Sequence, residues 1–193
     1  MKSISDYQAE HAAWELANFG PQLPERCHLG LIEEVGELAH AVLKQQQGIR
    51  GTTAEHDAAI RDAIGDILVY LLGYCTARQL KLSDSLIEEI SSFQHVHQIA
   101  NSEYTHTIGR KKTMSHPVDY WVRDASKTLT GVWLQNSWDI EALVFSLARI
   151  CCLKSWNIQE VFDDTWTKVV KKRNWKKDPT AGEEPVPAGE TDQ

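Results

Sequence analysis

The sequence EEVGEL at residues 33–38 lies within a strongly apolar helical pattern, and the sequence DAIGDI at residues 62–67 has the same character. Around the first segment, Leu31, Val35 and Leu38 recur at intervals of four and three residues, which is the period of an α-helix with one apolar face. The second segment leads into an apolar run that extends to residue 75. The pattern predicts two long helices, over about residues 25–47 and 53–80, at the centre of an all-α fold.

Both segments carry paired carboxylates at helical spacing. Glu34 and Glu37 are three residues apart, and Asp62 and Asp66 are four apart. Each spacing places the two side chains on one face of a helix. A carboxylate is costly to bury unless it is paired or bound to a metal. Four carboxylates directed from two helices to one place therefore predict a bound cation, and an all-oxygen ligand set favours Mg²⁺, with Mn²⁺ as the alternative ion.

A solvated helix face is the alternative interpretation of Glu33, Glu34 and Glu37. Two features favour the metal site over it. No Lys or Arg lies three or four residues from Glu34 or Glu37 to form an ion pair. Asp66 also begins the most apolar stretch of the chain, where a solvated carboxylate is not expected.

The remaining sequence predicts further helices and no strands. Helical periodicity covers residues 5–18, where Ser5 or Asp6 can cap the helix, and then 83–97, 118–135, 140–155 and 158–173. These helices predict a bundle divided into a first helical unit, a linker or long loop, a second helical unit and a disordered tail. The boundaries of these parts are 1–100, 101–116, 117–175 and 176–193.

The order of elements suggests an internal repeat. An amphipathic helix, a strongly apolar helix, a short break and a shorter helix occur twice, and residues 80–84 resemble residues 156–160. The alternative is the ordinary alternation of helices in any all-α chain. If the repeat is real, the second copy has lost its acids, because Asp119 and Asp124 are five residues apart and lie on different helix faces. One site per chain is therefore expected.

The segment EEVGEL, followed by GDILVYL at residues 65–71, resembles the all-α nucleoside triphosphate pyrophosphohydrolases. This superfamily includes the MazG proteins and the dimeric dUTPases, and its mark is E-x-x-E on one helix and E-x-x-D on the next. The resemblance covers residues 8–80, and residues 166–175 resemble the closing segment of MazG-like chains. It implies a MazG-like helical bundle that cleaves nucleoside triphosphates to monophosphate and pyrophosphate, in a house-cleaning or nucleotide-pool role.

The resemblance also implies roles for the carboxylates. Glu34, Glu37 and Asp66 match the family's metal ligands, and Glu33 or Glu34 is expected to orient and deprotonate the attacking water. This chain departs from the family's E-x-x-D motif at Ala63, where a Glu is expected. Asp62 is the nearest substitute and completes the expected metal ligands.

Substrate contacts follow from the same resemblance. Trp14 and Asn18 are expected beside the base, and Tyr70 beside the nucleotide, with core packing as the alternative for Tyr70. A further group of basic residues is expected to hold the leaving pyrophosphate, with a solvated basic helix end as the alternative. These residues are Lys44, Lys168, Lys172 and Arg173.

The composition limits the classes of partner that the protein is expected to bind. The formal net charge of -7 disfavours a broad nucleic-acid surface, and the longest apolar run is too short to span a bilayer. The four cysteines form no C-x-x-C pair, which indicates free thiols in a reducing compartment. The first residues do not show the pattern of a signal peptide. We therefore expect a cytoplasmic enzyme without membrane or nucleic-acid partners, either a homodimer or an intramolecular pseudo-dimer.

Two other functions remain open. Glu37 and His40 form an E-x-x-H motif, and Glu103 and His106 form a second, which is the helical signature of di-iron carboxylate proteins. A binding or scaffold protein with a decayed site on the same fold is the other alternative, and Ala63 favours it.

Overall fold

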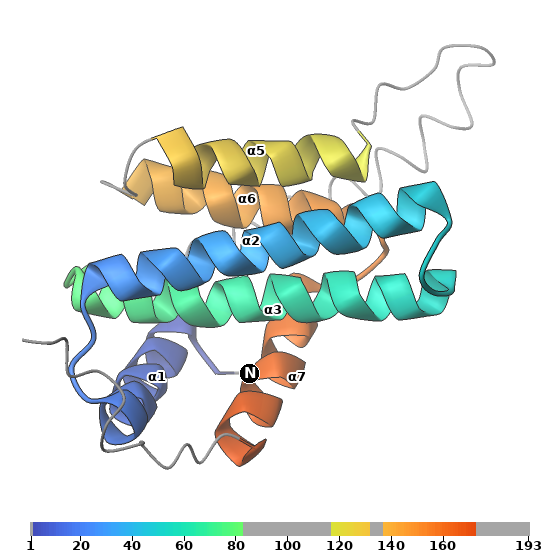
Figure 1. Cartoon of the computed structure of the whole chain (residues 1–193). Coiled ribbons are helices and arrows are strands. Elements are labelled where there is room, and N and C mark those ends of the chain that lie inside the picture. The colour runs from blue at the N-terminus through green and yellow to red at the C-terminus, as the bar shows by residue number, and fades with distance from the viewer. Residues whose placement is uncertain (1, 83–116, 132–136, 173–193) are drawn as a thin grey trace, which may run out of the picture.

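The computed structural model describes residues 2–82, 117–131 and 137–172. These residues form helices and no strands, so the predicted all-α class is confirmed (Figure 1). The helices are α1 (Ile4–Phe19), α2 (Pro24–Gln47), α3 (Thr53–Ala77), α5 (Val118–Gly131), α6 (Ser137–Leu153) and α7 (Ile158–Lys172).

Helix bounds follow the predicted periodicity closely, and the start of α1 needs a correction. Ser3, not Ser5 or Asp6, caps α1: its hydroxyl accepts from the backbone N–H of Asp6, whose carboxylate accepts in return from the N–H of Ser3. Helix α3 ends three residues before the predicted bound at residue 80. The predicted helix 83–97, the linker and the tail lie outside the described residues.

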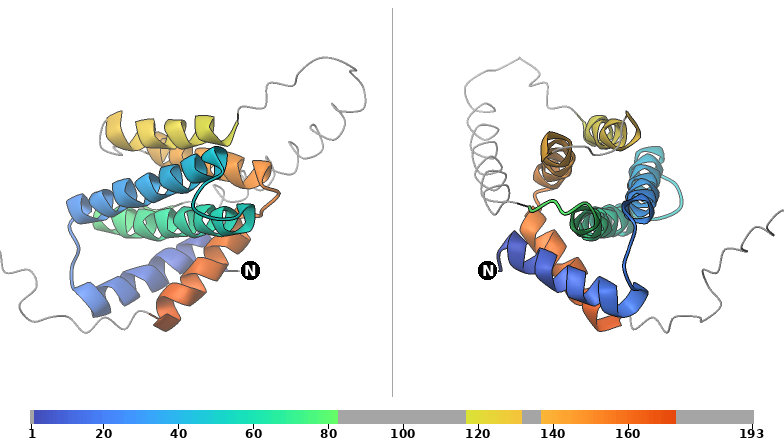
Figure 2. Two further views of the ribbon diagram at one scale, coloured as in Figure 1. Left: turned by 45° about the vertical axis from the view of Figure 1, so that its right-hand side comes forward. Right: turned by 90° about the vertical axis from the view of Figure 1, so that its left-hand side faces the viewer.

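The helices pack as two antiparallel pairs with two further helices on one side. Helix α2 pairs with α3, α5 pairs with α6, and α2 also packs against α5. Helices α1 and α7 pack against the other side of α3, so that α3 is covered from several directions (Figures 1 and 2). This explains why α3 is apolar almost all round its second half. Its fully buried side chains are Ile60, Ile64, Ile67, Leu71, Leu72, Tyr74 and Cys75.

Glycines of α3 allow the close approach of α1 and α7. A Cβ atom at Gly65 would overlap the hydroxyl group of Thr165 on α7. At Gly73 it would meet Glu15 Oε1 of α1 at 2.6 Å. The crossing at Gly65 requires glycine, because the short Thr165 side chain cannot move away, whereas at Gly73 the atom met is the end of the flexible Glu15 side chain, which can shift.

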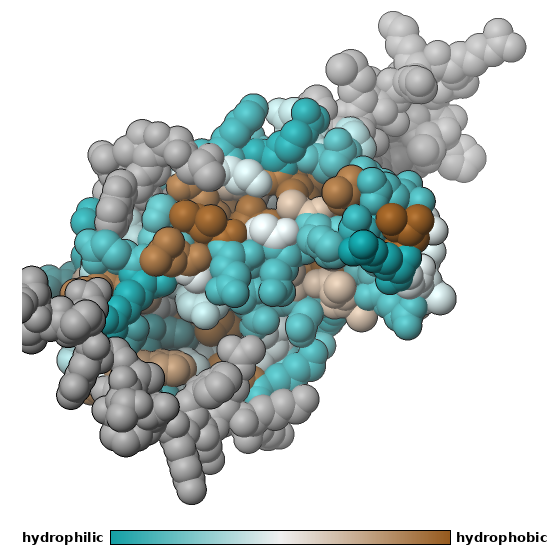
Figure 3. Space-filling model, in the orientation of Figure 1, coloured by the Kyte–Doolittle hydropathy of each residue, from teal (hydrophilic) through white to brown (hydrophobic). Residues whose placement is uncertain are grey.

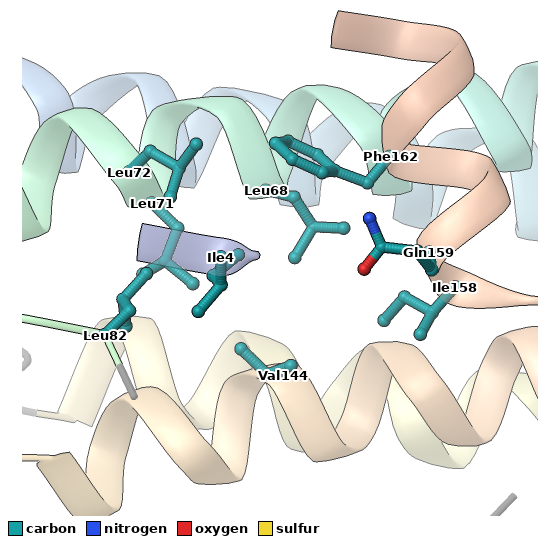
Figure 4. Close-up of a pocket in the computed structure, with 9 residues that line it drawn as sticks. All are labelled: Ile4, Leu68, Leu71, Leu72, Leu82, Val144, Ile158, Gln159 and Phe162. Atoms are coloured by element: carbon teal, nitrogen blue, oxygen red, sulfur yellow. The ribbon is translucent and has the colours of Figure 1, made fainter. Parts of the chain in front are cut away.

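A small apolar junction joins α1, α3, α6 and α7. Figure 4 shows Ile4, Leu68, Val144 and Phe162 converging on it, with Gln159 as its polar member. The gap at its centre has a volume of about 20 Å³, which is close to that of a single water molecule. The junction is therefore a packing contact and no ligand site.

Part of the apolar surface of α2 faces outward. Leu29 is 66 % exposed, Leu43 46 % and Ile32 39 %. Figure 3 shows apolar side chains gathered over one half of this face, with hydrophilic side chains around them. Within the described residues, no helix has the length and apolar character that a bilayer crossing requires.

The α3–α7 crossing gives a test of the fold. Gly65→Ala should lower the free energy of unfolding by about 1–3 kcal/mol, because its methyl group would collide with Thr165. Gly36→Ala is the matched control: no atom lies within 4 Å of a Cβ there, so it should raise the stability by about 0.5–1 kcal/mol. Urea denaturation measures both, and equal stability of the two variants would contradict the crossing.

Candidate functional site

The antiparallel register of α2 and α3 places the carboxylates opposite one another. A Cβ at Gly30 would overlap the Tyr70 ring, so these two residues face each other at one end of the pair. At the other end, Gln45 Nε2 donates to Asp57 Oδ1 at 2.8 Å. With this register, Glu34 on α2 lies opposite Asp66 on α3.

The carboxylates differ in their exposure along this row. The Oε2 atom of Glu34 is almost wholly shielded from solvent. Asp66 is half-buried, and Glu33 and Glu37 are exposed. The row therefore passes from the packed interior between the two helices to the open surface.

A large cavity lies at the end of this row that is closer to the turn between α2 and α3. Its volume is about 650 Å³, and its acidic lining residues are Glu33, Glu37, Asp62 and, in the capping box at the start of α3, Glu55. Basic and imidazole side chains line the same cavity closer to the α2–α3 turn, namely His40, Lys44, Arg50 and His56. The cavity therefore offers both metal-ligating oxygens and anion-binding groups.

Position 63 faces Glu37 across the two helices. Ala63 is buried and lines the large cavity, so a longer side chain there would enter the cavity. Asp62 lies at the rim, with its side chain 59 % exposed, and its Oδ1 atom is 3.6 Å from Lys168 Nζ of α7. The carboxylate of Asp62 is thus near the site without occupying the place of the missing glutamate.

A second cavity lies at the other end of the row, between α1, the start of α2 and α3, with Arg26 of α2 as its basic lining residue. Its volume is about 240 Å³. The rings of Trp14, Phe19 and Tyr70 line it, together with the carboxylate of Asp66. An aromatic cavity with a few polar groups is the usual form of a small-molecule site.

Buried polar groups of α1 face this second cavity. His11 is 2 % exposed, and burial lowers its pKa to about 4, so that the ring is neutral near pH 7. Its Nδ1 atom is 4.0 Å from Glu15 Oε2, and burial raises the pKa of Glu15. Burial, assisted by the nearby Glu15 carboxylate, raises the pKa of the Cys27 thiol to about 12. Cys27 is therefore protonated and unreactive.

The cavities separate the residues that the sequence predicted as one cluster. Of the four predicted metal ligands, Glu37 and Asp62 line the large cavity, Asp66 lines the smaller one, and Glu34 lines neither. In the described parts of the chain, no three His, Cys, Asp or Glu side chains are close enough to hold one metal ion. The predicted metal site stays a prediction.

The predicted substrate-binding residues do not form one cluster. Trp14 and Tyr70 share the smaller cavity, and Lys44 lines the larger one. Asn18 Nδ2 donates to the carbonyl of Trp14 at 2.7 Å and lines neither cavity. Lys168 contacts Asp62 at the rim. The side chain of Lys172 and all of Arg173 lie outside the described residues, as do Glu103 and His106.

Sequence reasoning missed His11, Glu15, Arg50 and His56. The first two lie four residues apart on α1, with Trp14 on the same side. That spacing was visible in the sequence, but α1 carries no clear apolar stripe that would show which face is buried. Arg50 belongs to the turn and has a positive φ of 60°. Its position over the cavity depends on the turn, which no helical period predicts.

Comparison with known families identifies the segment that carries these carboxylates. Residues 22–98 match the family model of the MazG nucleotide pyrophosphohydrolase domain. The resemblance to the MazG-like all-α superfamily is thereby confirmed for this part of the chain. It includes α2 and α3 and excludes α5, α6 and α7. Neither the curated proteins nor the solved structures gave a match.

The buried His11 gives a test of the smaller cavity. Because its pKa is about 4 when folded and near 6.5 when exposed, the unfolded chain binds more protons in this range, and stability should fall as pH drops from 6.5 to 4. The loss should reach about 3 kcal/mol. His11→Phe should reduce this slope in urea denaturation at a series of pH values.

The comparison isolates His11 because Glu15 is present in both proteins, so that its own titration largely cancels. A His11→Phe variant with the same pH dependence as the parent protein would show that His11 titrates normally and is not buried.

Proposed function

We propose that this chain is a Mg²⁺-dependent nucleoside triphosphate pyrophosphohydrolase that converts a triphosphate, (d)NTP, to the monophosphate and pyrophosphate. The observation that carries the proposal is the row of carboxylates along the α2–α3 seam, with an aromatic cavity at one end and a basic cavity wall at the other. A triphosphate has the same order of parts: an aromatic base, a central phosphate chain and a terminal anionic group. The family match supports a nucleotide substrate.

The smaller cavity suits the base. Trp14, Phe19 and Tyr70 offer ring faces for stacking. His11 and Glu15 add polar groups that can form hydrogen bonds to the edge of a base. Trp166 of α7 packs behind them, with its ring 5.9 Å from that of Trp14.

The carboxylates offer the type of ligand atom that a hard cation prefers. These groups supply oxygen ligands alone, and Glu34, Glu37 and Asp66 would have to converge to hold Mg²⁺, with Asp62 available at the rim. The buried Glu34 Oε2 atom supports this assignment, because a shielded carboxylate oxygen is stabilised by a cation. When bound, the ion would neutralise negative charge on the phosphates.

The remaining chemistry is a displacement by water at the α-phosphorus. Glu33 or Glu34 orients a water molecule and takes its proton as the water oxygen bonds to phosphorus. The bond from the α-phosphorus to the oxygen that bridges it to the β-phosphorus breaks, and this oxygen leaves with the pyrophosphate. Lys44 and Arg50 lie on the side of the large cavity where they can bind the leaving anion. Lys168 at the rim can assist them.

The proposal predicts Mg²⁺-dependent pyrophosphate release from at least one triphosphate in a panel of ribo- and deoxynucleotides. Glu37→Ala and Asp66→Asn should each lower kcat/KM by roughly 100-fold or more, because each removes charge needed in the transition state. An enzyme-coupled pyrophosphate assay measures the rates.

Glu25→Ala is the control, since Glu25 is an exposed acid in the first turn of α2 and lines neither cavity. Its rates should equal those of the parent protein. Activity that survives both Glu37→Ala and Asp66→Asn would rule out this site, and a panel without pyrophosphate release would rule out the activity.

Ala63 favours a second candidate, a nucleotide-binding protein that does not hydrolyse its ligand. Position 63 faces Glu37 and lacks the carboxylate of the family motif. On this hypothesis the parent protein binds triphosphates and releases no pyrophosphate. The same assay, combined with calorimetric binding of a non-hydrolysable triphosphate, separates the two candidates.

The position of Ala63 in the wall of the large cavity gives a further prediction. Ala63→Glu should tighten Mn²⁺ binding by about tenfold, because it adds a carboxylate opposite Glu37. Titration followed by the electron paramagnetic resonance signal of free Mn²⁺ measures the affinity.

Ala58→Glu is the matched control, with the same added charge on an exposed position of α3 that lines neither cavity. It should leave the affinity unchanged. Equal affinities of the two glutamate variants would mean that position 63 does not face a metal site.

A further inference from the structure

The end of the large cavity next to the α2–α3 turn is lined by cationic and imidazole side chains. Lys44 belongs to the last turn of α2, Arg50 to the connecting turn and His56 to the start of α3. Figure 1 shows this turn at the opposite end of the α2–α3 hairpin from the connection to α1. Three separate pieces of chain therefore bring such groups to one wall of the cavity.

The two cations of this wall have no acidic partner within the described residues. Lys44 Nζ donates to the amide oxygen of Gln47 at 3.2 Å, and the guanidinium of Arg50 forms no ion pair in this part of the chain. Glu55, the acid of the same wall, is held at the start of α3, where its Oε2 atom accepts from the N–H of Thr52 at 2.7 Å and from its hydroxyl at 2.9 Å. Two positive charges therefore remain available to an anion in the cavity.

His56 is the buried member of this wall. The residue is only 7 % exposed, and its Nε2 atom is shielded from solvent without a hydrogen-bond partner. Buried polar atoms normally have such a partner, because leaving them unpaired costs free energy. An unpaired nitrogen on a residue that lines a cavity indicates that a ligand atom completes its hydrogen bond.

The backbone of the turn leaves the approach to this nitrogen free of a side chain. Gly51 has a φ of 149°, and a Cβ atom there would lie 3.4 Å from Nε2 of His56. Arg50, one residue earlier, has a left-handed φ of 60°, which is uncommon for a residue other than glycine. The turn therefore brings an arginine to the cavity and a glycine to the imidazole.

The spacing along α3 relates this wall to the carboxylates. Six residues of helix lie between the levels of Asp62 and His56, which is about 9 Å along the axis. With a base in the smaller cavity and the reacting phosphate beside Glu37 and Asp62, the next two phosphates extend toward the turn. The last of them meets Lys44, Arg50 and His56, whereas a diphosphate ends before it reaches them.

We propose that Lys44, Arg50 and His56 form a subsite for the terminal phosphate, through which the protein selects nucleoside triphosphates over diphosphates and binds free pyrophosphate. His56 is then a specificity-determining residue, because its nitrogen has a partner only when that phosphate is present. The selection among nucleotides rests on the proposed function, whereas the anion subsite exists whether or not the protein hydrolyses them.

Binding of inorganic anions tests the subsite apart from catalysis. Pyrophosphate and orthophosphate are titrated separately into the full chain without metal, and the ¹H–¹⁵N signals of the histidine rings report binding. Pyrophosphate should shift the His56 signals and bind at least tenfold more tightly than orthophosphate. His56→Phe and Arg50→Gly should each weaken pyrophosphate binding about tenfold, since each removes a hydrogen bond to a charged group. Glycine at position 50 retains the left-handed turn.

Arg78→Gly is the matched control, because Arg78 is an exposed cation after the end of α3 that lines neither cavity. Its affinity for pyrophosphate should equal that of the parent protein. Three results would each overturn the subsite: His56 signals that do not move, equal affinities for the two anions, or unchanged pyrophosphate binding in both His56→Phe and Arg50→Gly.

Calorimetry with non-hydrolysable nucleotides tests the selection and separates it from the proposed function. Triphosphates and diphosphates of the common bases are compared in the presence of Mg²⁺. The tightest triphosphate should bind at least tenfold more tightly than its diphosphate, and Arg50→Gly should bring this ratio close to one. A ratio near one in the parent protein would overturn the selection. A protein that meets these expectations and releases no pyrophosphate would retain the subsite and contradict only the proposed hydrolysis.

Discussion

The antiparallel packing of α2 against α3 is the contact on which the rest of the structure depends. The close approach of Gly30 to Tyr70 at one end and the hydrogen bond from Gln45 to Asp57 at the other fix its register. That register brings Glu34 opposite Asp66, and Glu37 opposite Ala63. A shift of one residue would rotate each carboxylate by about 100° away from the seam, so the candidate site exists only in this pairing.

The buried helix α3 provides the scaffold for the contact between α2 and α3. Helices α1 and α7 reach α3 closely because Gly73 and Gly65 offer no side chain at the crossings. These contacts place Trp14 in the wall of the smaller cavity, with Trp166 packed against its ring, and bring Lys168 to the rim of the larger one. Packing and candidate chemistry therefore share the same helix, and its apolar sequence serves both.

Polar contacts tie the α2–α3 and α5–α6 hairpins together at one end of the bundle. The first hairpin keeps a row of carboxylates, which are costly to hold together and lower the stability of the surface that carries them. Lys154, which binds Gln45 and Asp57, ties the end of the second hairpin to the turn of the first.

The sequence by itself determined the helices and the acidic residues that α2 and α3 bring to the candidate site. The period of Leu31, Val35 and Leu38 fixed the buried face of α2, and the spacing of Glu34 and Glu37 fixed the side chains that share a face, because both depend only on local helix geometry. The tertiary structure alone decided that Asp62 lies at the rim beside Lys168, that Ala63 fills the place opposite Glu37, and that His11 and Glu15 of α1 face a cavity with Tyr70. These relations depend on how separate helices cross, which is set by contacts between residues far apart in the chain and leaves no period in the sequence.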